Sequence, residues 1–199
     1  MNLDDPSPDE LSSAEDLHLM LRVRDGDIDA FESLVVKHQH SVIGTVARML
    51  GNPSDSEDIA QQVFIRVWKS AARYEPTAKF TTWLMTITRN LVFNESRRRG
   101  RAKIVPLHDE TDEGPVTQHA DPDASTPSDE LLDAELREAV DTAIAELPEK
   151  HRLAIVLRRY ENLAYEEIAK VLKTSVPAVK SILFRARADL KAKLQRYLD

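Results

Sequence analysis

Apolar side chains recur at intervals of three and four residues along most of the chain, the spacing that places them on one face of an α-helix. The helices that this spacing predicts cover residues 27–50, 54–71, 80–99, 131–147, 149–159, 164–172 and 175–197. Gly51-Asn52-Pro53 is a combination that ends a helix, so it separates the first two. Because no run of note alternates apolar and polar residues as a half-buried strand does, the pattern predicts an all-α fold.

The predicted helices fall into two groups, separated by residues 105–129. This stretch is acidic, has little apolar content and carries several helix-breaking residues. Such a composition cannot bury enough surface to offset the entropy lost on ordering. We therefore expect two small helical domains, residues 27–104 and 130–199, joined by a flexible acidic linker. Residues 1–26 are interpreted as an acidic segment that contains the start of the first helix, and no role is assigned to them.

The charge of the 199-residue chain is −7 in total, which by itself argues against a nucleic-acid partner. The total conceals two basic blocks. Residues 31–103 hold 12 basic and 6 acidic side chains, and residues 136–199 hold 13 basic and 9 acidic ones. Residues 104–135 between them hold 10 acidic side chains and no basic one. Asymmetry of this kind indicates that each basic block meets a polyanion.

Several classes of function are disfavoured by what the chain lacks. The absence of cysteine excludes disulfides, thiolate metal sites and cysteine nucleophiles. No apolar run is long enough to span a membrane, and the acidic N-terminus is unlike a signal peptide, so we expect a cytoplasmic protein. His38 and His40 point in different directions on a helix, so no metal site is expected there. Phosphate-binding glycine loops and nucleophile motifs are also missing, and we expect neither a cofactor nor an enzyme.

The last two predicted helices have the spacing of a helix-turn-helix. A turn at Lys173-Thr174 leads to a helix capped by Ser175, with Pro177 in its first turn. This geometry can place the second helix in the major groove of DNA. On its outward face we expect side chains suited to base edges, phosphates and a thymine methyl, namely Lys180, Ser181, Phe184 and Arg185. The alternative is a helical hairpin with a solvated basic face.

Two features of the first domain also allow two interpretations. The helix over residues 80–99 ends in arginines (Arg97, Arg98, Arg99 and, past Gly100, Arg101), which contact phosphate or simply complement the helix dipole. Upstream, Phe80 and Trp83 fall on the buried stripe, whereas Tyr74 lies in a loop and is the better platform for an unpaired base. A polar patch with large apolar neighbours is either a solvated helix face or a docking surface; it comprises Asp58, Gln61, Gln62, Phe64 and Trp68.

Taken in order, these motifs resemble those of bacterial RNA polymerase sigma factors of the sigma-70 family, in particular the extracytoplasmic-function (ECF) group. The resemblance covers residues 15–104 and 130–198. The motifs are Asp58-Ile59-Ala60-Gln61-Gln62-Val63-Phe64 with Trp68, Phe80-Thr81-Thr82-Trp83-Leu84 through Arg89-Asn90-Leu91 to the arginine run, Leu147-Pro148-Glu149, Tyr165-Glu166-Glu167-Ile168-Ala169, and Val179-Lys180-Ser181 through Arg185-Ala186-Arg187.

The resemblance implies an alternative sigma factor that binds core RNA polymerase, recognises promoters, melts the −10 element and initiates transcription, as in stress responses. Its region-two domain would dock on the clamp coiled coil of the largest polymerase subunit through Asp58, Gln61, Gln62 and Phe64. The −10 element would meet Tyr74 and Asn90, which match the base pocket, together with Asn94, Arg97, Arg98 and Arg101. The region-four domain would read the −35 element through Lys180, Ser181, Phe184 and Arg185.

The same resemblance implies control by an anti-sigma factor, and a chain that works as a monomer without entering the membrane. Two other classes of function stay open. A self-sufficient helix-turn-helix repressor or activator would bind its site tightly alone, although such proteins usually need a symmetric dimer and no dimerisation segment is evident. An enzyme acting on nucleic acid would modify or hydrolyse DNA when magnesium is added.

Overall fold

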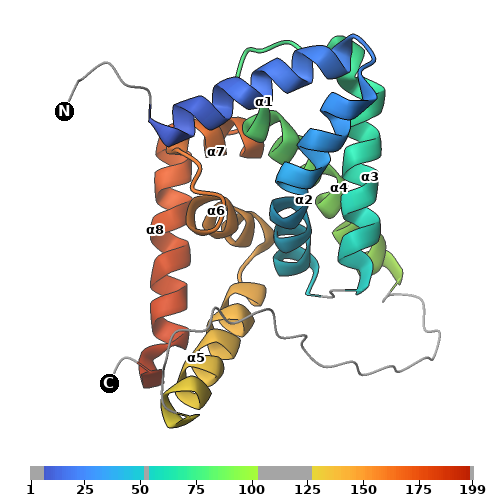
Figure 1. Cartoon of the computed structure of the whole chain (residues 1–199). Coiled ribbons are helices and arrows are strands. Elements are labelled where there is room, and N and C mark those ends of the chain that lie inside the picture. The colour runs from blue at the N-terminus through green and yellow to red at the C-terminus, as the bar shows by residue number, and fades with distance from the viewer. Residues whose placement is uncertain (1–6, 52–53, 103–126, 198–199) are drawn as a thin grey trace.

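The computed structural model describes residues 7–51, 54–102 and 127–197, and these residues form helices and short connections without a strand (Figure 1). The predicted all-α fold is therefore confirmed. The α-helices are α1 (Pro8–Arg24), α2 (Ile28–Leu50), α3 (Ser54–Ser70), α4 (Phe80–Ala102), α5 (Pro127–Ala145), α6 (Glu149–Arg159), α7 (Tyr165–Leu172) and α8 (Val176–Lys193). Two short 3₁₀ turns, η1 (Ala71–Arg73) and η2 (Gln195–Tyr197), follow α3 and α8. None of the described helices is long and apolar enough to cross a membrane.

Local signals in the sequence place most helix ends correctly. The carboxylate of Asp27 accepts a hydrogen bond from the backbone N–H of Ala30 at 3.0 Å, which caps the start of α2. Gly51 ends the same helix in the left-handed conformation, at φ 69°, which glycine adopts at little cost. The boundary of the predicted linker is wrong at one end, because α5 already begins at Pro127, and proline is favoured in the first turn of a helix. The rest of that linker lies outside the described residues.

The interpretation of residues 1–26 as an acidic segment with only the start of a helix is wrong. Pro8–Arg24 is a complete helix, capped by Ser7 and packed on α2. Its buried side chains are Asp16, Met20 and Val23. Since one of these three is charged, and leucines elsewhere on the helix are only partly covered, α1 shows no apolar stripe of the kind that periodicity detects.

The two halves of the chain pack against each other around one continuous apolar core. Helices α1 to α4 form the first half and α5 to α8 the second, with α4 against α7 and α2 against α5 and α6 (Figure 1). The carboxylate of Glu161 accepts hydrogen bonds from Ser41 and, at 2.9 Å, from Thr45 on α2. The guanidinium of Arg48 lies 3.8 Å above the ring of Tyr160. Polar contacts between side chains therefore connect the halves as well as apolar packing.

Candidate nucleic-acid and partner interfaces

Helices α7 and α8 form the helix-turn-helix that the sequence predicts. The turn contains Lys173, whose φ of 53° is unusual for a residue with a side chain. Ser175 caps α8 through the backbone N–H of Ala178 at 3.4 Å. Val179 and Leu183 are fully buried and attach α8 to the rest of the second half. This packing fixes which side of α8 remains open to a partner.

The outer face of α8 consists of Lys180, Ser181, Phe184 and Arg185, and all four are exposed as the helical spacing predicts. Phe184 is 74% exposed, the most open of the large apolar side chains that the structure describes. Within the described part of the chain, neither Lys180 nor Arg185 is held in an ion pair. Two uncompensated cations beside an exposed aromatic ring are suited to a polyanion that also offers apolar contacts, as the major groove of DNA does.

The C-terminal half of α4 carries a second group of exposed polar and basic side chains, here called the α4 basic end: Asn90, Asn94, Arg97, Arg98 and Arg101. Arg98 is partly neutralised, because its guanidinium donates two hydrogen bonds to Glu95, at 2.7 and 2.8 Å. Hydrogen bonds from Arg98 and Arg99 lower the pKa of Glu95 to about 2. Among the described residues, Arg97 and Arg101 have no ion pair, so they are the cations most available to a phosphate.

Tyr74 does not lie open in its loop, contrary to the prediction of an accessible base platform. It is 2% exposed, and its ring meets that of Trp83 edge to face with centroids 5.0 Å apart. Trp83 is the less buried of the two. The loop signal at Tyr74 was correct, but packing of α1 against η1 and α4 covers this side of the loop, and such long-range contact has no signature in the local sequence.

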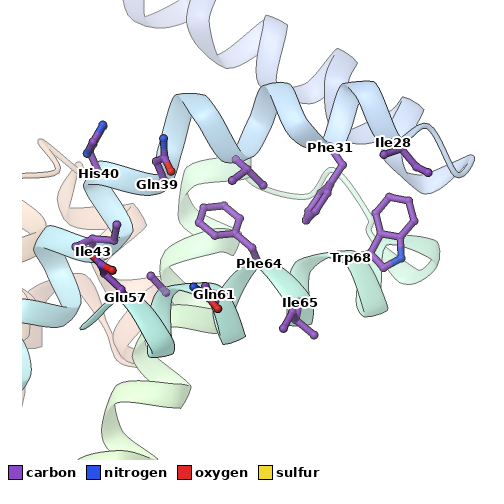
Figure 2. A pocket seen from close by; sticks show the side chains of 12 residues that line it. Ile28, Phe31, Gln39, His40, Ile43, Glu57, Gln61, Phe64, Ile65 and Trp68 are labelled. Carbon is purple, nitrogen blue, oxygen red and sulfur yellow. The ribbon is translucent and has the colours of Figure 1, made fainter. Parts of the chain in front are cut away.

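A groove of about 940 Å³ runs between α2 and α3 (Figure 2). Of the residues predicted to dock a partner, Gln61 and Phe64 line it, while Asp58 and Gln62 are exposed on α3 nearby. Phe64 is only 6% exposed, so it lines the groove without protruding from it. The opposite wall was missed in the sequence because its residues belong to the apolar stripe of α2; they are Ile28, Phe31, Val35 and Ile43.

The α2–α3 groove remains unusually apolar for a surface. Ile28 is 68% exposed, Ile65 is 51% exposed and Trp68 is 37% exposed. Exposed apolar side chains gathered along a groove indicate a protein contact.

The side chains of the two histidines point in different directions, as predicted. His40 lines the groove, while His38 is buried on the other side of α2.

Comparisons with known proteins identify related chains over nearly the whole length. The family models described as "Sigma-70 region 2" and "Sigma-70, region 4" match residues 34–102 and 137–190. The RNA polymerase sigma-H factor of Pseudomonas aeruginosa is 35% identical to this chain, and the alignment covers 94% of this chain and 98% of the relative. The ECF RNA polymerase sigma-E factor of Haemophilus influenzae is also 35% identical, and that alignment covers 90% of this chain and 95% of the relative.

A solved structure shares the fold. CnrH, in complex with the cytosolic domain of CnrY, superposes with a TM-score of 0.65 and 25% sequence identity. The superposition covers 92% of this chain and 98% of CnrH. The likeness therefore extends over both halves of the chain rather than one of them.

Proposed function

Because this chain belongs to the ECF group of the sigma-70 family, we propose that it binds core RNA polymerase, directs it to promoters and opens the −10 element. The observation that carries this proposal is the combination, on one chain, of two separate exposed basic surfaces and an apolar groove. A promoter offers two elements on one duplex, and the polymerase offers a protein surface. In this proposal the chain contributes binding energy and orientation, and the polymerase performs the covalent chemistry.

The α2–α3 groove and the adjoining face of α3 are proposed to contact the clamp coiled coil of the largest polymerase subunit. A helical partner would place apolar side chains against Phe64 and Trp68, and its polar flank would meet Asp58, Gln61 and Gln62. Buried apolar area near the centre of an interface supplies most of its affinity, while the polar rim sets the register. The exposed fractions of Ile65 and Trp68 support this assignment.

The α4 basic end is proposed to hold the −10 element, and the outer face of α8 the −35 element. Arg97, Arg98 and Arg101 would contact phosphates, with Asn90 and Asn94 facing bases. The aromatic pair of Tyr74 and Trp83 at the start of α4 would receive an unpaired base, which requires a rearrangement that exposes the Tyr74 ring. Stacking of a base on an aromatic side chain contributes about 1–3 kcal/mol and offsets part of the cost of unstacking.

The division into domains follows from this assignment. Residues 27–104 are proposed to serve the polymerase and the −10 element, and the residues from Pro127 onward, where α5 begins, the −35 element, with the acidic stretch between them as the linker. Since the two halves pack together in this structure, they would have to separate before they could reach two elements of one promoter.

Control by an anti-sigma factor is proposed as well. CnrH, which shares the fold over both halves, was solved with a bound protein domain, so this architecture accommodates such a partner. A regulator that occupied the α2–α3 groove would compete directly with the polymerase. The chain itself is proposed to act as a monomer, because its two basic surfaces already provide one reader for each element.

Transcription in vitro with core polymerase and a library of promoters tests the proposal. The full chain should direct initiation and select a −35 and a −10 sequence, and Gln61→Ala with Trp68→Ala should abolish core binding. Glu166→Ala, an exposed change on α7 outside these surfaces, is the matched control. Tight, sequence-specific binding of promoter duplex by the chain alone would favour a repressor or activator, and magnesium-dependent cleavage of DNA would favour an enzyme.

A further inference from the structure

Three buried polar side chains come from α1, α2 and the loop before α4. Asp16 on α1 is 2% exposed, His38 on α2 is 8% exposed and Tyr74 in the loop is 2% exposed. Oδ1 of Asp16 lies 3.1 Å from Nε2 of His38 and 2.7 Å from Nζ of Lys37. None of the sequence motifs and none of the surfaces proposed above includes Asp16.

One of these three side chains, Tyr74, lacks a polar partner among the described residues. The phenolic oxygen of Tyr74 is buried without a hydrogen-bond partner among the described residues, whereas Asp16 and His38 contact each other. A buried polar atom in that state costs free energy and calls for an explanation, since apolar residues of similar volume would pack at lower cost. The Tyr74 hydroxyl, in that state beside a buried carboxylate and imidazole, points to a requirement other than stability.

The cluster is connected to the proposed base-capturing aromatics by two routes. Asp16 contacts His38, and His38 packs against a row of aromatic rings. The ring centroids of His38 and Phe80 are 5.3 Å apart, and those of Phe80 and Trp83 are 6.1 Å apart. Trp83 in turn contacts Tyr74. The second route is electrostatic, because burial and then the charge of Asp16 raise the pKa of the Tyr74 phenol.

Asp16 is charged in this environment. Burial acts to raise its pKa, but polar contacts from His38 and Lys37 outweigh burial, and the pKa of the carboxyl lies below its ordinary value. This fixed anion contacts His38, and packed rings connect His38 to the Tyr74 side chain. Helix α1 also contacts η1 and α4 directly, so it can hold the whole loop in place.

We propose that Asp16 is a positioning residue for promoter opening: from α1 it sets the place of the Tyr74–Trp83 pair that receives the unpaired base of the −10 element. This inference rests on the proposed function and deepens it, because it assigns a role in the −10 step to a helix outside the surfaces that contact DNA or the polymerase. Asp16 acts through Tyr74 and His38 and touches neither DNA nor polymerase.

The test uses holoenzyme assembled from core polymerase and the full chain. Asp16→Asn should weaken binding of a single-stranded −10 oligonucleotide about tenfold, as expected when a stacking platform is displaced, and should slow promoter opening, followed with 2-aminopurine in the −10 element, to a similar degree. Affinity for core polymerase and for duplex −35 DNA should stay unchanged. Asp16→Glu, which keeps the carboxylate, should recover most of the −10 affinity.

Glu15→Gln is the matched control, because it removes the same charge from the neighbouring position of α1. Glu15 also pairs with Lys37, whose Nζ lies 2.6 Å from Oε2 of Glu15. Its side chain is 63% exposed, and among the described residues it contacts neither Tyr74 nor His38. Glu15→Gln should leave every readout unchanged.

Four results would overturn the inference. The first is equal behaviour of Asp16→Asn and Glu15→Gln, and the second is a loss in Asp16→Asn that is spread over core, −35 and −10 binding alike. The third is unfolding of Asp16→Asn, which would make its role purely structural, and the fourth is a failure of Asp16→Glu to recover −10 affinity. If the unsubstituted chain directed no transcription with core polymerase, the proposed function would fall first, so the two failures are distinguishable.

Discussion

The contact of Glu161 with α2 is expected to decide how firmly the two halves of the chain stay together. Glu161 belongs to the turn after α6, and its carboxylate accepts hydrogen bonds from Ser41 and Thr45 on α2. Thr45 is 1% exposed, so water cannot replace the carboxylate while the halves remain closed. Glu161→Ala removes both hydrogen bonds and leaves the Thr45 hydroxyl buried without this acceptor.

The size of the effect follows from these two bonds. A hydrogen bond to a charged group contributes about 1.5–3 kcal/mol, but part of the loss is regained when the freed groups meet water in the open form. We expect Glu161→Ala to weaken closure by about 2–3 kcal/mol. Since about 1.4 kcal/mol corresponds to a tenfold change, the ratio of closed to open chains should fall roughly 30- to 140-fold.

Energy transfer between two dyes measures this ratio directly. The chain has no cysteine, so Glu32→Cys on α2 and Lys191→Cys on α8 provide unique labelling sites at exposed positions. In a urea titration, transfer efficiency should drop at a lower urea concentration in Glu161→Ala than in the unsubstituted chain, before the helical circular dichroism signal is lost. Separation of the halves would then precede unfolding of either half.

Glu166→Ala serves as the control, because it removes an exposed carboxylate from α7 in the same half of the chain. It should leave the transfer curve in place. If Glu161→Ala gave the same curve as Glu166→Ala, the hydrogen bonds across the interface would not hold the halves together, and apolar packing would have to account for closure alone.

Four further outcomes are expected. Phe184→Ala should weaken holoenzyme binding to a promoter with a −35 element about tenfold in a filter-binding assay, and should leave the melting temperature unchanged because the ring is 74% exposed. Glu95→Gln should lower the melting temperature above pH 4.5, and the difference from the unsubstituted chain should vanish as the pH falls toward 2. Hydrogen bonds from two arginines hold the pKa of Glu95 at about 2, against an ordinary 4.5, and they stabilise the fold only while Glu95 is ionised. Arg152→Leu should cost about 3 kcal/mol in urea unfolding, since its guanidinium donates to three backbone carbonyls that would lose their partner. Lys173→Gly should raise stability in the same assay by about 1 kcal/mol, because φ at this position is 53° and glycine adopts it without strain.

The linear pattern of the sequence determined the features that depend on neighbours along the chain. Helical spacing identified seven of the eight described α-helices, and the capping residue Ser175 placed the start of the last one. It also showed that Phe184 faces outward, because burial of Val179 and Leu183 fixes the opposite face of the same helix. These features follow from a period of 3.6 residues, and that period can be read without knowing the fold.

The tertiary structure decided whatever depends on residues that are distant in sequence. Tyr74 is buried and α1 is an integral helix, because Asp16, His38 and Tyr74 come from three segments that meet only after folding. The α2–α3 groove needed both of its walls, and the Glu161 contact spans more than a hundred residues. The spacing of residues along the chain carries no information about such long-range contacts. It shows which face of a helix is apolar, whereas packing determines which residues that face contacts and how much of it remains exposed.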